Sequence, residues 1–372
     1  MNFDIRQGNA LDRLREIPDC SVNCCITSPP YFGLRDYGTA EWEGGSADCN
    51  HSRNNSPDPK NPNCGSANGR GPASQALNRA TCAACGARRI DSQIGLESTP
   101  EQYIARLVGV FREVRRVLRD DGVLFVNIGD SYNAYNGGAG PSSSLSRGAQ
   151  TEARPRLESG FGLQVKALKP KDLIGIPWML AFALRADGWF LRQDLIWHKP
   201  NPMPESVKDR CTKAHEYIFL LSKSQRYWWD ADAIREPSES TDPRVARSSR
   251  TFAGAVQRNS DLERYGTTRG RTNQPCCNEN GRNKRSVWTI ASLPAPEAHF
   301  ATFPIDLPEL CLKAGCPEGG TVLDPFSGAG TTGLACLKNG RNYIGIELNA
   351  AYIEIAHQRA RKYYPLLIEA TA

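Results

Sequence analysis

A chain of 372 residues can hold one large domain with insertions or two modest domains. Hydrophobic residues make up 40% of the sequence, enough for a buried core, and a formal net charge of +6 permits a polyanionic partner without requiring one. The longest apolar run, near residues 173–184, is interrupted by Pro177 and is too short to span a bilayer. Because no basic-then-apolar leader is visible, we expect a cytoplasmic protein without a membrane partner.

The first part of the chain alternates between buried strands and amphipathic helices. Strands are predicted over residues 3–5, 21–26 and 123–128, and helices over residues 10–17 and 100–119. Thr99 has the position of an N-cap and Pro100 that of the first helical residue. Residues 120–122, Asp-Asp-Gly, predict a turn from that helix into the next strand.

The same alternation continues to the C-terminus. Helices are predicted over residues 171–186, from about residue 331, and over residues 350–363. Strands are predicted over residues 189–197, 217–221, 322–323 and 343–346. This order favours an α/β fold with a doubly wound, mostly parallel, Rossmann-like sheet and helices on both faces. Polar insertions interrupt it at residues 43–95, 133–165 and 236–285.

Two polar loops follow predicted strands near opposite ends of the chain. Residues 27–31 read Thr-Ser-Pro-Pro-Tyr, and residues 324–330 read Asp-Pro-Phe-Ser-Gly-Ala-Gly. An open α/β sheet binds its ligands at the carboxyl ends of its strands. The sequence therefore predicts that both loops contribute to one site.

The first loop suits chemistry at an amino group conjugated to a ring, whose lone pair is delocalised. Hydrogen-bond acceptors aimed at the two N–H bonds localise that lone pair toward an electrophile, and the Ser28 hydroxyl and the Pro29 carbonyl supply two acceptors. Pro29 and Pro30 fix φ, so the acceptors are held in place before a substrate arrives. Tyr31 offers a face on which an extruded base can stack.

The second loop suits a nucleoside. Gly328 and Gly330 let the backbone approach a ligand closely, and Glu347, at the end of the next predicted strand, is placed to accept hydrogen bonds from ribose hydroxyls. The loop lacks both the G-x-G-x-x-G of dinucleotide folds and the Gly-Lys-Ser/Thr of phosphate loops.

Together the two loops resemble those of the S-adenosylmethionine-dependent amino-methyltransferases of DNA, and their order is similar to the circularly permuted group often called β. The resemblance implies Ser28, Pro29, Pro30 and Tyr31 as catalytic residues. It implies contacts to the cofactor from Asn9, Thr302, Phe303, Asp324, Phe326, Gly328, Gly330 and Glu347. Asn9 departs from the family pattern, which usually has Asp at this place.

In this family an acidic or Asn lead residue usually accompanies methylation of adenine N6, and Ser usually accompanies cytosine N4. Ser28 therefore favours transfer to the N4 amino group of a flipped cytosine in double-stranded DNA, with adenine N6 as the alternative. Less favoured are an RNA or protein amino-methyltransferase and a non-catalytic, zinc-bearing DNA-binding protein. The resemblance implies a prokaryotic or phage-encoded enzyme, and leaves open a homodimer and a restriction endonuclease partner.

The resemblance also divides the chain. Residues 1–42 and 96–235 correspond to the catalytic half, residues 236–285 to a target-recognition segment, and residues 286–372 to the cofactor-binding half. The recognition segment contains ten Lys or Arg and six Asp or Glu, and arginine suits contacts to guanine edges and phosphates. Residues 35–37 and 197–206 are further candidates for DNA contact.

The insertion at residues 43–95 is rich in cysteine. It contains Cys49-x-His51 and Cys82-x-x-Cys85, followed by a glycine. Paired ligands of these types form tetrahedral zinc sites, so we expect a structural zinc ion on these four side chains, with Cys64 as a replacement ligand. Metal binding would supply folding free energy that this polar segment cannot obtain from burial.

Overall fold

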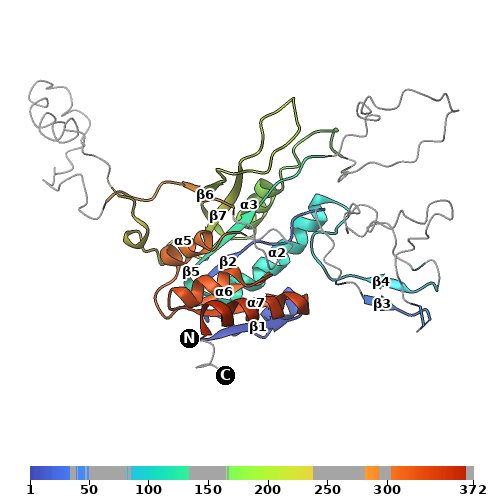
Figure 1. Cartoon of the computed structure of the whole chain (residues 1–372), viewed down its shortest axis with the longest axis horizontal. Coiled ribbons are helices and arrows are strands. Elements are labelled where there is room, and N and C mark those ends of the chain that lie inside the picture. Colours follow the sequence, from blue (N-terminus) through green and yellow to red (C-terminus); the bar gives the residue numbers. More distant parts are fainter. Residues whose placement is uncertain are drawn as a thin grey trace, which may run out of the picture.

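The computed structural model describes residues 1–33, 39, 41–46, 48–49, 82, 85–133, 165, 167–237, 281–292 and 303–365. At its centre lies an eight-stranded sheet in the order β1-β10-β9-β2-β5-β7-β6-β8 (Figure 1). The strands are β1 (Phe3–Gln7), β2 (Val22–Thr27), β5 (Leu118–Ile128), β6 (Phe190–His198), β7 (His215–Ser222), β8 (Val287–Thr289), β9 (Thr321–Asp324) and β10 (Asn342–Glu347). Only β7 runs antiparallel to its neighbours, β5 and β6, so the predicted mostly parallel sheet is confirmed.

Helices cover both faces of this sheet. One face packs against α1 (Ala10–Arg15), α2 (Pro100–Val117) and α3 (Ile176–Ala186). The other packs against α5 (Asp306–Gly315), α6 (Thr331–Lys338) and α7 (Ala350–Tyr363). Successive side chains of a strand point to opposite faces, and accordingly Cys24 joins the second core while Cys25 joins the first.

Two further elements lie outside this framework. A two-stranded antiparallel sheet consists of β3 (Glu41–Glu43) and β4 (Arg88–Ile90), at the lower right of Figure 1. A short 3-10 helix, η2 (Asp232–Ile234), contacts α5. The sequence did not indicate β3, β4, β8, η2 or α5.

Most of the predicted elements are confirmed, with differences at their ends. Helix α2 begins as expected, because the Thr99 hydroxyl accepts a hydrogen bond from the backbone N–H of Gln102. Helix α3 begins at Ile176 rather than at residue 171, because the Asp130 carboxylate accepts the backbone N–H groups of Gly175 and Ile176. Strand β5 begins at Leu118, so the predicted Asp-Asp-Gly turn lies within it.

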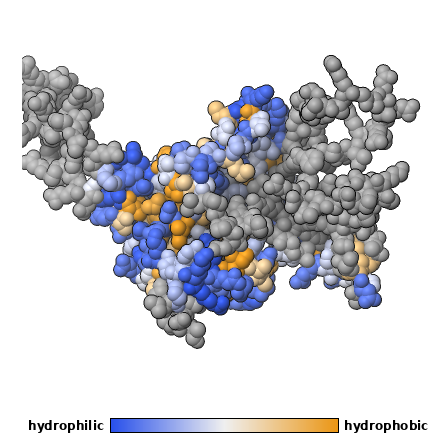
Figure 2. Space-filling model, viewed as in Figure 1, coloured by the Kyte–Doolittle hydropathy of each residue, from blue (hydrophilic) through white to orange (hydrophobic). Residues whose placement is uncertain are grey.

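The surface visible in Figure 2 is largely hydrophilic, with smaller hydrophobic areas in the region of α5. Among the described residues, no helix combines the length and apolar character needed to cross a membrane.

Candidate functional site

Strand pairing brings the two predicted loops together. β2, which leads into the Thr-Ser-Pro-Pro-Tyr loop, pairs in parallel with β9, which leads into the Asp-Pro-Phe-Ser-Gly-Ala-Gly loop. β9 pairs in turn with β10, which ends at Glu347, and β10 pairs with β1. Because these strands are parallel, their carboxyl ends lie at one edge of the sheet. We call the first loop (residues 28–31), which the sequence predicts to be catalytic, the catalytic loop, and the second (residues 325–330) the glycine loop.

A buried carboxylate connects the two loops. Asp324 Oδ1 accepts a hydrogen bond from the Thr27 hydroxyl at 2.6 Å and from the backbone N–H of Phe326 at 3.1 Å. Its Oδ2 accepts from the Thr332 hydroxyl, at the start of α6, at 2.8 Å. Burial raises the pKa of Asp324 to about 6. The sequence reasoning missed Thr27 and Thr332, whose hydroxyls satisfy a carboxylate that would otherwise be costly to bury.

The glycine loop is held against the end of β10. Glu347 Oε2 accepts the backbone N–H of Gly328 at 2.8 Å, and its Oε1 accepts that of Asn349 at 2.9 Å. Burial raises the pKa of Glu347. Gly328 and Gly330 both have positive φ, and a Cβ on Gly330 would lie 2.7 Å from that of Ala356. A carboxylate has about four acceptor sites, so Glu347 retains capacity for a ligand.

Asn9 lies beside this edge, directly after β1. Its Oδ1 accepts the backbone N–H of Leu11 at 2.9 Å and so caps α1. Asp and Asn serve equally well as N-caps, which explains why the helix tolerates Asn where the family usually has Asp. The cap uses the amide oxygen of Asn9 and not its amide nitrogen.

Of the remaining residues predicted to contact the cofactor, two pack against the hydrophobic cores and one is not described. Phe326 packs, partly buried, against the first core. Phe303 packs against the second core, just before α5. Thr302 lies outside the described residues.

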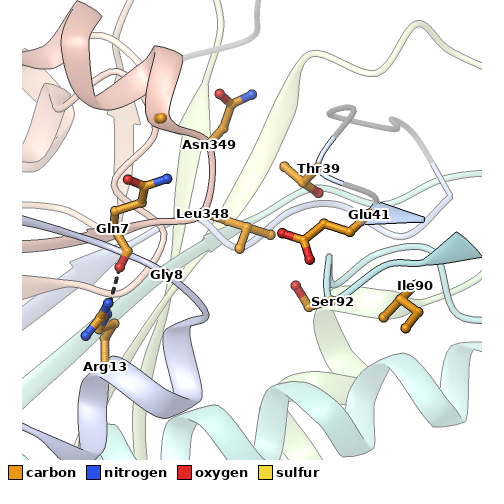
Figure 3. Close-up of a pocket in the computed structure, with 10 residues that line it drawn as sticks. Gln7, Gly8, Arg13, Thr39, Glu41, Ile90, Ser92, Leu348 and Asn349 are labelled. Atoms are coloured by element: carbon orange, nitrogen blue, oxygen red, sulfur yellow. Dashed lines mark hydrogen bonds between the residues drawn. The ribbon is translucent and has the colours of Figure 1, made fainter. Parts of the chain in front are cut away.

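A cavity of about 620 Å³ opens at the carboxyl ends of β1 and β10 (Figure 3). Gln7, Gly8 and Arg13 line it from the end of β1 and from α1, and Leu348, Asn349 and Ala350 line it from the end of β10. Thr39, Glu41, Ile90 and Ser92 line its other side, in and around β3 and β4. Its position at the carboxyl ends of β1 and β10 is where an α/β sheet binds a nucleoside.

The catalytic loop is fixed by contacts along its length. The Tyr103 hydroxyl, from α2, donates to the Pro30 carbonyl at 2.8 Å. The Tyr31 ring lies so close to Gly129 that a Cβ there would be 2.6 Å from Tyr31 Cε2.

The Tyr31 hydroxyl belongs to a polar cluster that sequence reasoning did not find. It donates to Glu216 Oε2, on β7, at 2.6 Å, and the Asn127 amide donates to the same oxygen at 3.2 Å. The Lys199 ammonium pairs with Glu216 Oε1. Burial and the Glu216 carboxylate raise the pKa of Tyr31, and a hydrogen bond with Ser28 acts in the opposite direction. Tyr31 therefore stays protonated and able to donate to Glu216.

The residues expected to contact DNA are described only in part. Residues 35–37 and 238–280 lie outside the described residues. The described ends of the 236–285 segment meet each other: the backbones of Glu236 and Arg282 exchange hydrogen bonds. The Glu236 carboxylate also pairs with Arg282, Lys284 and Arg285. Within 197–206, Trp197 is buried and donates to the Ile290 carbonyl, whereas Met203 is 86% exposed.

Three of the predicted metal ligands lie together. The sulfur atoms of Cys49, Cys82 and Cys85 are all within 4.8 Å of one another. Backbone N–H groups of Ala87 and Ser46 lower the pKa of Cys85 to about 7. The fourth expected ligand, His51, and the replacement, Cys64, lie outside the described residues.

Comparison with known proteins agrees with this geometry. Residues 22–358 match the N6/N4 family described as DNA methylase. The chain belongs to this family. DNA methylases similar to it include the Type II methyltransferase M.Cfr9I of Citrobacter freundii, 39% identical over 353 residues, which covers 95% of this chain and 86% of the relative. The Type II methyltransferase M.SmaI of Serratia marcescens is 37% identical over 352 residues, covering 95% of this chain and 88% of the relative.

A solved structure shares the fold of this DNA methylase. The PvuII DNA methyltransferase, titled cytosine-N4-specific, superimposes with a TM-score of 0.54 at 15% identity, covering 96% of this chain and 86% of that one. The predicted Rossmann-like methyltransferase fold is confirmed, and the chain is a DNA methyltransferase.

Proposed function

We propose that this DNA methyltransferase is site-specific and transfers a methyl group from S-adenosylmethionine to the exocyclic N4 amino group of a flipped cytosine. The observation that carries the proposal is the hydrogen bond between Thr27 and Asp324, which holds the Ser-Pro-Pro-Tyr loop beside the glycine loop. The Type II names of the relatives support site specificity.

The donor set fits S-adenosylmethionine. Glu347 offers carboxylate oxygens to the ribose, and Asn9 offers an amide to the adenine edge. Their chain neighbours, Leu348 and Gly8, line the cavity. The positive φ of Gly328 and Gly330 keeps side chains away from the loop that faces the ligand. Phe326, Thr302 and Phe303 complete the proposed contacts, and Asp324 acts by holding the loop. When bound, the sulfonium supplies an electrophilic methyl group.

The chain's own residues prepare the target nitrogen. Ser28 Oγ and the Pro29 carbonyl accept the two N–H bonds of the cytosine amino group, which localises the nitrogen lone pair. Pro30 stiffens the loop, and Tyr31 stacks on the target base once that base has left the DNA duplex. The methylated ammonium then loses a proton to water, which needs no strong base.

Ser28 supports cytosine N4 over adenine N6 as the target. The first residue of the catalytic loop is serine, which in the family that this chain resembles usually accompanies methylation of cytosine N4.

DNA recognition is proposed for the 236–285 segment, whose ends are joined by ion pairs of Glu236 with Arg282 and Arg285. Residues 35–37 and 197–206 are proposed to contact the duplex near the target base. The Type II relatives also support a place in a restriction–modification system with an endonuclease partner. Light scattering would decide whether the enzyme is a homodimer, as relatives with this loop order often are.

We further propose a structural zinc ion bound by Cys49, Cys82 and Cys85, with His51 as the fourth ligand. The thiols are close enough to share one ion, and three thiolates with one imidazole form a common tetrahedral zinc site. Elemental analysis of the purified chain is expected to give one zinc per chain, and Cys82→Ser should lose it.

The substrate class is tested by label transfer from methyl-labelled S-adenosylmethionine to DNA, RNA and protein in parallel. We expect label in DNA alone. Ser28→Ala should reduce transfer by about 100-fold while the Kd for S-adenosylmethionine, measured by calorimetry, stays within about twofold of wild type. Label in RNA or protein instead of DNA would overturn the proposal.

A further inference from the structure

The cysteine-rich insertion ends beside the catalytic loop. The backbone N–H of Gly33, two residues after that loop, donates at 2.8 Å to the carbonyl of Gly95, the last residue of the insertion. A Cβ on Gly95 would lie 3.0 Å from the Tyr31 carbonyl oxygen. A change in the position of the insertion is therefore expected to affect residues next to the catalytic loop.

Strand β4 in the insertion pairs with β3, and we call this two-stranded unit the hairpin. Its two ends make different contacts. In the pairing of β3 with β4, Glu43 faces Arg88 at one end and Glu41 faces Ile90 at the other. The first end adjoins the cysteine cluster, because Cys82 N–H donates to the Ala87 carbonyl at 2.7 Å and a Cβ on Gly45 would lie 2.7 Å from Cys85 Sγ.

The second end forms one side of the cavity. Glu41, Ile90, Thr39 and Ser92 line it opposite the residues that follow β1 and β10. Figure 3 shows the Glu41 carboxylate and the Leu348 side chain pointing toward each other across this space. Leu348 directly follows Glu347, the proposed ribose ligand, so the hairpin lies on the nucleoside side of the cofactor site.

The paired strands have little hydrophobic burial of their own, and Ile90 is 45% exposed. Their anchor to the main sheet follows β4, where Ile94 joins the first core and Arg106 donates to the Ser92 and Gln93 carbonyls. An isolated two-stranded hairpin is marginally stable in water at best. The close group of three thiols is the feature that can cross-link residues on both sides of the hairpin, and a metal ion bound there contributes folding free energy directly.

We propose that the β3–β4 hairpin is a wall of the cofactor site and that a zinc ion on Cys49, Cys82 and Cys85 holds this wall in place. The zinc ion thus controls cofactor affinity without touching the cofactor. The inference rests on the proposed zinc site and on the proposed use of S-adenosylmethionine.

The test combines metal content with cofactor affinity. Wild type, Cys82→Ser, Cys85→Ser and Ile90→Ala are compared for zinc per chain, for the Kd of S-adenosylmethionine by calorimetry, and for folding of the main sheet by circular dichroism. Cys211→Ser, which changes an exposed cysteine away from the cluster, is the matched control. Zinc is added back to chelator-treated wild type as a second route.

We expect Cys82→Ser and Cys85→Ser to lose zinc and to bind S-adenosylmethionine about tenfold more weakly. A tenfold rise in Kd corresponds to a wall that is in its binding position in about a tenth of the molecules. Ile90→Ala should keep its zinc and weaken binding about threefold, because it trims the wall itself. Cys211→Ser should match wild type, and zinc should restore the chelated enzyme.

Each failure has its own signature. Loss of zinc with an unchanged Kd would overturn the proposed wall and leave the zinc site standing. A wild type that contains no zinc, and whose Kd for S-adenosylmethionine does not change when zinc is added, would overturn the role of the metal. An unchanged Kd in Ile90→Ala would then overturn the wall as well. Absence of S-adenosylmethionine binding in folded wild type would overturn the proposed function itself.

Discussion

Thr27 and Asp324 are in direct contact, with the threonine hydroxyl 2.6 Å from the carboxylate, although 297 positions separate them in the chain. The contact joins the last residue of β2 to the last residue of β9. It therefore sets the distance between the loop proposed to hold the target base and the loop proposed to hold the methyl donor.

Replacing Asp324 with alanine should destabilise the enzyme by about 2–4 kcal/mol. It leaves the buried Thr27 hydroxyl without its acceptor, and leaves the Thr332 hydroxyl with its 3.4 Å contact to the Ile26 carbonyl. Urea unfolding measures this change in the free energy of unfolding. Asp324→Asn, which keeps the shape and one acceptor oxygen, is the matched control and should cost less than half as much. Equal stability of Asp324→Ala and wild type would contradict the role given to this carboxylate.

The Glu216 carboxylate should affect turnover rather than cofactor binding. Glu216→Gln weakens the acceptor for the Tyr31 hydroxyl, and we expect kcat to fall about tenfold, equivalent to the loss of about one hydrogen bond in the transition state. Calorimetry should find the Kd for S-adenosylmethionine unchanged. Tyr31→Phe should give a similar loss, and Asp194→Asn, on the neighbouring strand β6, should give none. A weaker Kd with normal kcat would show that Glu216 serves the cofactor instead.

Glu347 should make cofactor binding depend on pH. Its raised pKa means that it takes up a proton at a higher pH than an ordinary glutamate, and protonation removes an acceptor for the ribose. We therefore expect the Kd for S-adenosylmethionine to rise as the pH falls through that folded-state pKa. Glu347→Gln should weaken binding about tenfold at neutral pH and flatten the pH dependence. The exposed Glu354, changed to Gln, is the control, and a pH dependence that survives in Glu347→Gln would exclude Glu347 as its source.

Gly129 should be required for the position of Tyr31. A methyl group at this position would overlap the Tyr31 ring at 2.6 Å, so Gly129→Ala should lower kcat by about tenfold or more through displacement of the catalytic loop. Gly109→Ala, on α2, adds a methyl group with nothing within 4 Å and should leave kcat unchanged. If Gly129→Ala methylates at the wild-type rate, the ring does not need its observed position.

Much of the fold follows from the sequence because its signals are local. Thr99 and Pro100 mark the start of α2, and the strand–helix–strand unit from β9 to β10 can be read from apolar runs and two glycines. Helix α5 was missed because Pro308, the third of its ten residues, interrupts its apolar pattern. Strands β3, β4 and β8 have three residues each, too few for an alternating pattern to be recognised.

The sequence predicted those site residues that are consecutive in one loop. Residues 28–31 and 324–330 each form a recognisable loop, and parallel pairing brings them together. The contact from Tyr31 to Glu216 joins residues 185 positions apart across β2, β5 and β7. Such a contact depends on strand order, which the sequence does not state. For the same reason the sequence could not place the cysteine-rich hairpin beside Leu348.

The most direct test of the central claim is the identity of the methylated nucleoside. Unmethylated DNA of varied sequence is treated with the purified enzyme and methyl-labelled S-adenosylmethionine, digested to nucleosides and analysed by mass spectrometry. The proposed role of Ser28 predicts labelled N4-methylcytosine, lost in Ser28→Ala. Labelled N6-methyladenine in its place would contradict the assignment of the base, while leaving the fold and the cofactor site intact.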